Sequence, residues 1–138
     1  MKNVLIFILS ILLFNCTSDD KEPEFIDSPI VGKWKIIEQL IDPGDGSGAF
    51  ESITNNRTIE FFNNGKVVIN GVLCYLSTEI KSNNSGTFNE EKGSFYDGEI
   101  IPNNCEFDNA RVFYKYDDSN LIIWYRCYEA CGQKFEKI

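Results

Sequence analysis

The sequence contains no histidine among its 138 residues. This absence excludes Ser-His-Asp and Cys-His catalysis and removes the commonest metal ligand of proteins. Basic residues are also few, with 13 Lys and Arg against 21 Asp and Glu and a net charge of −8, and they form no cluster. Nucleic-acid binders need clustered Lys and Arg to contact phosphates, so we expect no nucleic-acid partner.

Motifs that carry catalysis or bind a cofactor are missing as well. No glycine-rich phosphate loop follows a predicted strand. The densest acidic pair after residue 24 is Glu90-Glu91, but adjacent strand residues point to opposite faces and do not converge on a substrate. The acidic loop at residues 42–48 lacks the spacing of an EF-hand. We therefore expect no catalytic residue, no metal site, no cofactor and no enzyme activity.

A long apolar run is absent beyond the N-terminus. Residues 4–14 form an uncharged run that only Ser10 interrupts, directly after the positive Lys2. This run is too short to span a bilayer, which takes about 20 apolar residues, but it suits the apolar region of a secretory signal. We therefore predict a signal peptide over residues 1–15. The alternative is a buried N-terminal helix of a cytosolic protein.

The motif Leu13-Phe14-Asn15-Cys16 ends this run and resembles the lipobox of bacterial lipoproteins. The resemblance implies cleavage before Cys16, a diacylglycerol on its thiol, and a further fatty acid such as palmitate on its amine. Two or more acyl chains anchor a protein stably, so the membrane is the expected partner of this end. Thr17 follows the cysteine in place of an aspartate, which favours the outer membrane. An ordinary signal peptide with Cys16 as a free or paired thiol is the alternative.

Residues 16–29 are charged, contain Pro23 and have no apolar face, so we expect a flexible linker. The segment Ser18-Asp19-Asp20-Lys21-Glu22 is similar to the acidic tether of surface-exposed lipoproteins in one group of Gram-negative bacteria. The resemblance implies a cell-envelope protein on the outer membrane, exposed at the cell surface. A plain solvated linker without an address is the alternative. Residues 30–138 then form one domain.

An even number of cysteines remains after Cys16, as expected of disulfides in an exported chain. These are Cys74, Cys105, Cys127 and Cys131. Of three possible pairings we favour Cys74–Cys105 and Cys127–Cys131, which contribute about 3.5–4 and about 2 kcal/mol in the chain-entropy model. The second bond requires a turn at residues 128–130, and Gly132 is consistent with one. A four-cysteine zinc site is the rival, although no C-x2-C spacing occurs.

Short β-strands separated by turn residues fill the domain. The Asn63-Asn64-Gly65 segment predicts a tight hairpin, because Asn and Gly tolerate positive φ values. The pattern indicates an all-β, antiparallel meander that closes into a barrel or sandwich. The predicted strands are 31–41, 57–62, 66–70, 72–80, 87–96, 99–101, 106–116, 121–128 and 133–138.

The G-x-W motif at Gly32 and Trp34 opens the first strand, and with the later strands it resembles small bacterial lipocalin-like domains. The resemblance implies an antiparallel up-and-down barrel of about eight strands. Gly32 would allow close approach of the chain, and Trp34 would plug the closed end. A cation often covers that tryptophan, and we expect Arg126 in this role, with Lys137 second.

Tyrosines are the remaining candidates for a ligand site, because buried phenols need hydrogen-bond partners. Those that could line a cavity are Tyr75, Tyr114, Tyr116 and Tyr125. Alternatively they fill the core. Two functions remain open: a domain that binds a small apolar molecule or lipid in a cavity of several hundred Å3, or an envelope protein-interaction module. The second, an inhibitor or accessory subunit, has a filled core and a functional loop at 42–52 or 83–86.

Overall fold

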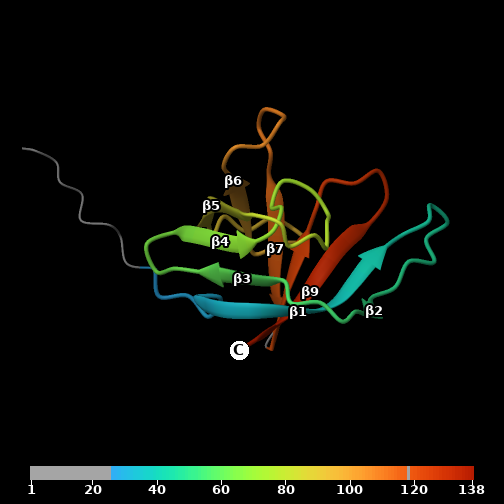
Figure 1. The fold of residues 1–138 in the computed structure, drawn as a ribbon, viewed down its shortest axis with the longest axis horizontal. Helices are drawn as coiled ribbons and strands as arrows, with labels where there is room; N and C mark the ends of the chain where they lie inside the picture. Colours follow the sequence, from blue (N-terminus) through green and yellow to red (C-terminus); the bar gives the residue numbers. More distant parts are fainter. Residues whose placement is uncertain (1–25, 118) are drawn as a thin grey trace, which may run out of the picture.

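The computed structural model describes residues 26–117 and 119–138, which form β-strands and no helix (Figure 1). Within these ranges no helix is long and apolar enough to cross a membrane. The predicted signal peptide, Cys16 and most of the acidic linker lie outside the described residues. The strands are β1 Gly32–Ile41, β2 Glu51–Ser52, β3 Thr58–Phe61, β4 Lys66–Asn70, β5 Asn83–Asn89, β6 Gly98–Pro102, β7 Val112–Asp117, β8 Asn120–Trp124 and β9 Cys131–Lys137.

The strands form an antiparallel meander that closes on itself. From β3 to β9 each strand pairs with the next, and β1 pairs with both β3 and β9. The result is an eight-strand up-and-down barrel of the lipocalin-like kind, as predicted. The short β2 is an additional strand beside β1, where Glu38 pairs with Ser52 on one side and with Lys134 of β9 on the other.

Alternation of apolar and polar residues sets the inward face of each strand. In β3 the side chains of Ile59 and Phe61 point into the core, and in β8 those of Leu121 and Ile123 do the same, each at most 1% exposed. Gly65 adopts a φ of 80° in the turn between β3 and β4. The predicted Asn-Gly hairpin is therefore confirmed.

The predicted strand at 72–80 is wrong, because this segment is a loop between β4 and β5. Leu73 enters the core, and Cys74 is bonded to Cys105. Its carbonyl groups are bound by side chains of other strands, as described below, and these contacts replace a neighbouring strand. The wall strand beside β4 is β5, which begins at Asn83, before the predicted strand at 87–96, and ends at Asn89. The strand predicted from residue 106 begins later, at β7.

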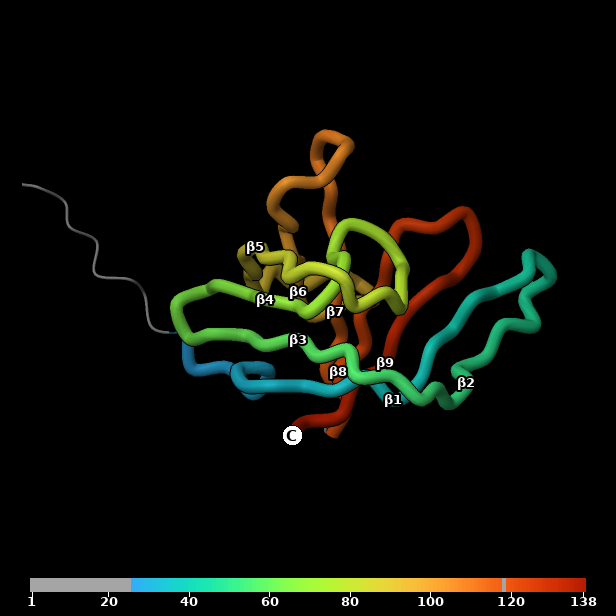
Figure 2. Tube along the Cα trace, viewed as in Figure 1, coloured from blue at the N-terminus to red at the C-terminus, as the bar shows by residue number. Residues whose placement is uncertain are grey.

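The two ends of the barrel differ in their connections. The Trp34 end consists of residues 26–31 and the connections 62–65 and 90–97, and Ile26 donates its backbone N–H to the Asn63 carbonyl there (2.7 Å). The loop end consists of the longer connections 42–50, 71–82, 103–111 and 125–130, which extend from the barrel in Figure 2. Residues 26–31 lead into β1 at the Trp34 end, and β1 then runs to loop 42–50. The chain therefore enters the barrel at the end opposite the loop end.

Trp34 closes its end of the barrel with 1% of its surface exposed. Its Nε1–H donates to the Ile30 carbonyl at 2.7 Å. The Lys137 ammonium lies 5.3 Å from the ring centroid and donates to the Pro29 carbonyl at 2.9 Å. Gly32, with a φ of 127°, leaves room for this lysine, since a Cβ would lie 3.0 Å from the Lys137 Cε.

Arg126 does not cover Trp34, and this prediction is wrong. Arg126 is exposed and follows β8 at the loop end. Trp34 pairs with Lys137 near the end of β9, whereas the residues next to Arg126 face the beginning of β9. The length of a strand therefore separates Arg126 from the tryptophan, and Lys137 takes the cation–π position.

Candidate functional site

Side chains fill the interior of the barrel. Phe61 packs edge-to-face on Phe88 and on Tyr114, with ring centroids 5.1 and 6.0 Å apart. The Tyr114 ring also crosses Gly98 on the neighbouring strand, where a Cβ would lie 2.3 Å from the phenolic oxygen. A ligand chamber inside the barrel would require these rings to move.

The four tyrosines predicted to line a cavity do not converge. Tyr114 and Tyr116 border a groove of about 300 Å3 at the Trp34 end, together with residues 28–30 and the charged side chains Glu90, Lys92 and Asp97. Tyr125 is buried near the loop end, and Tyr75 is 54% exposed on the 71–82 loop. The structure therefore brings two of the four together, at a surface groove.

Tyr114 makes the barrel sensitive to alkaline pH. Burial, reinforced by the negative charges of Glu90 and Asp97, raises its pKa above the usual 10, and its hydroxyl donates to the Asn89 carbonyl at 3.0 Å. Because the pKa is raised only in the folded chain, the unfolded chain ionises first, and stability falls above pH 10 by up to about 1.4 kcal/mol per pH unit for each such tyrosine. Burial raises the pKa of Tyr125 in the same direction.

We expect Tyr114→Phe to make the fall in stability between pH 9 and pH 11 shallower, even though it loses about 1 kcal/mol at pH 7 with its hydrogen bond. Urea unfolding across this pH range measures the slope. Equal slopes for the two chains would contradict the assignment. Tyr116→Phe, at the rim of the same groove, is the control.

A buried polar network closes the loop end. Arg57 is fully buried, and its guanidinium donates to the carbonyls of Val72 and Glu79 and lies 3.4 Å from the Tyr125 hydroxyl. Gly71 allows this approach, because a Cβ there would lie 2.7 Å from Nη1 of Arg57. The buried Arg57 guanidinium thus attaches loop 71–82 to the loop end of the barrel.

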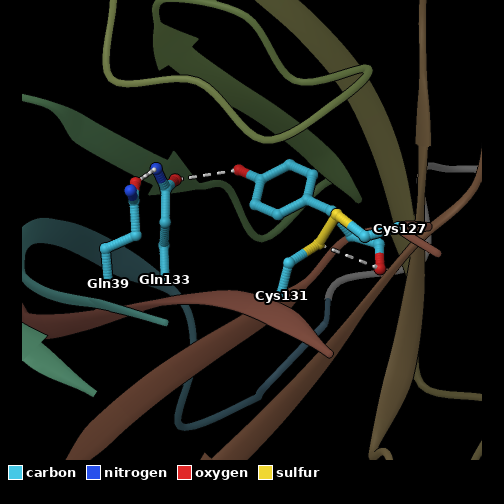
Figure 3. Close-up of a disulfide and its surroundings, with 5 residues drawn as sticks. Gln39, Cys127, Cys131 and Gln133 are labelled. Carbon is cyan, nitrogen blue, oxygen red and sulfur yellow. Dashed lines mark hydrogen bonds between the residues drawn. A yellow bond between two sulfur atoms is a disulfide. The ribbon is translucent and has the colours of Figure 1, made fainter. Parts of the chain in front are cut away.

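Gln133 extends this network from β9 and is also fully buried. Its Nε2 donates to the Ser77 carbonyl at 2.9 Å and to the Gln39 amide oxygen at 3.0 Å, while its own Oε1 accepts the Tyr125 hydroxyl at 3.1 Å. Figure 3 shows Gln39 and Gln133 side by side near the Cys127–Cys131 disulfide. Arg57, just before β3, and Gln133 of β9 therefore hold one loop, and Gln39 of β1 supports Gln133.

Both disulfides lie at the loop end and confirm the predicted pairing. Cys74–Cys105 joins loop 71–82 to loop 103–111, with Cα atoms 5.7 Å apart. Cys127–Cys131 closes the turn between β8 and β9, with Cα atoms 6.0 Å apart. A backbone hydrogen bond from Asp42 to the Ala130 carbonyl (2.9 Å) ties loop 42–50 to this turn. The four loops are therefore braced against one another or against the barrel.

Aromatic side chains project from these braced loops. Tyr75, Phe107 and Tyr128 are 54%, 48% and 106% exposed and come from three of the loops. We name them, with the surrounding exposed charges, the loop-end surface. The cations of the four loops are Lys81 and Arg111, which pair with Glu79 and Glu99, and the exposed Arg126, and further acidic side chains are exposed on the same loops. Those exposed acidic side chains are Asp45, Glu106, Asp108 and Glu129.

The two loops proposed as functional from the sequence have different positions. Residues 83–86 belong to the wall strand β5. Residues 42–50 form part of the loop end, where the Asp42 carboxylate accepts the amides of Gly44 (2.7 Å), Gly46 and Gly48. The Gly44 hydrogen bond in particular lowers the pKa of Asp42. Among residues 26–117 and 119–138 no cluster of His, Cys, Asp or Glu could hold a metal ion.

An apolar groove of about 340 Å3 lies on the outer wall of β7 and β8, and we name it the outer-wall groove. It is lined by Phe95, Tyr96, Phe113, Lys115 and Trp124. Tyr96 packs on Phe113 with centroids 4.5 Å apart, and Trp124 covers Gly132 of β9. Sequence reasoning did not predict this groove, although the alternation that turns Tyr125 inward turns Trp124 outward.

Comparison with known protein families, curated proteins and solved structures finds no match for this chain. The eight-strand barrel is compatible with a lipocalin-like binding domain.

Proposed function

We propose that this chain is an outer-membrane lipoprotein, anchored through Cys16 and exposed at the cell surface, whose barrel is a protein-interaction module. The filled interior supports this function over a small-molecule or lipid chamber. Phe61 and Tyr114 occupy the space that an apolar ligand would need. Binding then takes place on the surface.

The observation that carries the proposal is the clustering of both disulfides at the loop end, beneath exposed aromatic side chains. Cross-linked loops lose little conformational freedom on binding, so more of the contact energy appears as affinity. Tyrosine and other large aromatic residues are common energetic anchors of interfaces. Phe107 and Tyr128 have this character.

The charge of the loop-end surface defines the partner. Acidic side chains such as Asp108 and Glu129 exceed the available cations there. Complementary potentials steer association and select partners. We therefore expect an envelope protein whose contact surface combines basic residues with an apolar patch.

Photo-crosslinking in intact cells tests this function. A photoreactive amino acid at Tyr128 or Phe107 is expected to give one discrete protein adduct. Glu129→Lys should lower the adduct yield at least tenfold, because like charges across an interface cost several kcal/mol. The same photoreactive residue at Thr87, exposed on β5, is the matched control.

Adducts of equal yield at Thr87 and Tyr128 would refute the loop-end assignment. So would native mass spectrometry that finds an apolar molecule bound stoichiometrically to the purified barrel. In the second case the core must open to accept a ligand, and the first function considered from the sequence would replace this one.

A further inference from the structure

The connection 90–97 links the outer-wall groove to the groove at the Trp34 end, where the described chain begins. Residues 28–30 and the connection 90–97 border the same groove at the Trp34 end. That connection also supplies Phe95 and Tyr96 to the outer-wall groove. The part of the chain that would be anchored and the exposed aromatic wall therefore lie on neighbouring parts of the surface.

We propose that the outer-wall groove docks on the surface of a phospholipid bilayer. The inference extends the proposed function, since it takes from it the lipid anchor at Cys16. The barrel then has two points of membrane contact, the acyl chains and this aromatic wall, while the loop end stays available for a protein.

The side chains of the groove match the chemistry of a membrane interface. Trp124 and Tyr96 are amphipathic rings of the kind enriched at the level of the headgroups, and Phe95, 84% exposed, presents an apolar ring. Lys115 is charged on a long apolar stem and can place its ammonium among phosphates. Aromatic residues combined with lysine are typical of surfaces that lie in the interface.

The charge of the residues that line the groove suits a bilayer surface. The chain has a net charge of −8, yet the residues that line the groove include Lys115 and no carboxylate. Carboxylates would be repelled by headgroup phosphates and would be costly at the membrane surface. The loop-end surface has the opposite, acidic character.

The length of the tether is compatible with docking. Ten residue steps separate Cys16 from Ile26, so at roughly 3.4 Å per step this part of the chain can span at most about 34 Å. This reach matches the dimension of a small barrel, so the wall beside residues 28–30 can lie on the bilayer to which Cys16 is anchored. No long linker separates the two contacts.

Tryptophan fluorescence tests the contact directly, because the chain contains two tryptophans. Trp34 is 1% exposed inside the barrel, and Trp124 lines the groove. The lipidated chain is reconstituted into phosphatidylcholine vesicles with and without dibrominated acyl chains. We expect brominated lipid to quench the emission of the native chain but not that of Trp124→Phe, in which Trp34 alone emits.

Partitioning of the non-lipidated Cys16→Ser chain onto the same vesicles supplies a second readout. Phe95→Ser should weaken partitioning about tenfold, because it removes a large apolar ring from the contact. Phe95 is too exposed for this change to affect folding. Tyr128→Ser, which removes another exposed aromatic ring at the loop end, is the matched control and should not change partitioning.

The inference is overturned if brominated lipid quenches the native chain no more than Trp124→Phe, or if Phe95→Ser and Tyr128→Ser partition alike. A discrete protein adduct from a photoreactive residue at Phe95 would also overturn it, and would assign the groove to a protein. Failure of the anchor is distinguishable, since it appears as palmitate labelling that is absent or that persists in Cys16→Ser.

Discussion

Arg57→Met is expected to lower the free energy of unfolding by about 3 kcal/mol, whereas Arg126→Met should change it by less than about 0.5 kcal/mol. Arg57 is fully buried beneath loop 71–82, and its guanidinium donates to the carbonyls of Val72 and Glu79. Methionine removes the donors but leaves the acceptors, and each buried polar group without a partner costs about 1–3 kcal/mol.

An apolar replacement of a buried charge can be harmless when the partners are replaced at the same time. Backbone carbonyls cannot be replaced by substitution, so Arg57→Met leaves them in place. Urea unfolding of the two variants measures the difference. Hydrogen exchange in loop 71–82 should rise in Arg57→Met alone, because the loop loses its attachment to β3.

Similar stability of Arg57→Met and Arg126→Met would contradict this account of the loop end. Retained protection of loop 71–82 in Arg57→Met would do the same, since it would mean that the other attachments, among them the Gln133 contact to Ser77 and the Cys74–Cys105 bond, hold the loop without Arg57. Gln133→Leu in the Arg57→Met background then measures the share of each side chain.

The strands that could be predicted are those whose signal is local. The Asn63-Asn64-Gly65 turn has residues that favour positive φ, and Gly65 indeed adopts 80°. In β8 the alternation of Leu121 and Ile123 with outward residues gives the buried face directly. Disulfides were predicted from the even number of cysteines after Cys16 and the expectation of an exported chain, and the favoured pairing among three is confirmed.

Loop 71–82 could not be predicted, because the contacts that hold it join distant parts of the sequence. Its apolar residues, such as Leu73, have the composition of a strand. The side chains that bind its carbonyls are Asn55 and Arg57, from the segment before β3, and Gln133, from β9. Backbone groups satisfied by side chains leave no periodic pattern along the chain.

Candidate sites were harder to predict than strands for a related reason. Alternation shows which residues share a face, but not whether an inward tyrosine borders a cavity or fills the core. Tyr114 is opposite Gly98, and that pairing, invisible in the sequence, fills the space a ligand would need. Arg126 and Lys137 were distinguished only by the register of β8 on β9.

Replacing Cys74 and Cys105 by serine is expected to lower the free energy of unfolding by about 3.5–4 kcal/mol, against about 2 kcal/mol for the Cys127–Cys131 pair. The first bond closes a separation of 31 residues and the second one of 4, and a longer closed loop restricts the unfolded chain more. Denaturant unfolding of the two double variants gives both values.

The same variants connect stability to binding at the loop end. Loops 71–82 and 103–111 carry Tyr75 and Phe107, and without the Cys74–Cys105 bond these side chains must be ordered when a partner binds. At a temperature where the barrel stays folded, the crosslinking yield at Phe107 should therefore fall in the Cys74→Ser, Cys105→Ser chain. An unchanged yield would mean that the barrel and the Arg57 network hold the loops in their binding arrangement without the disulfide.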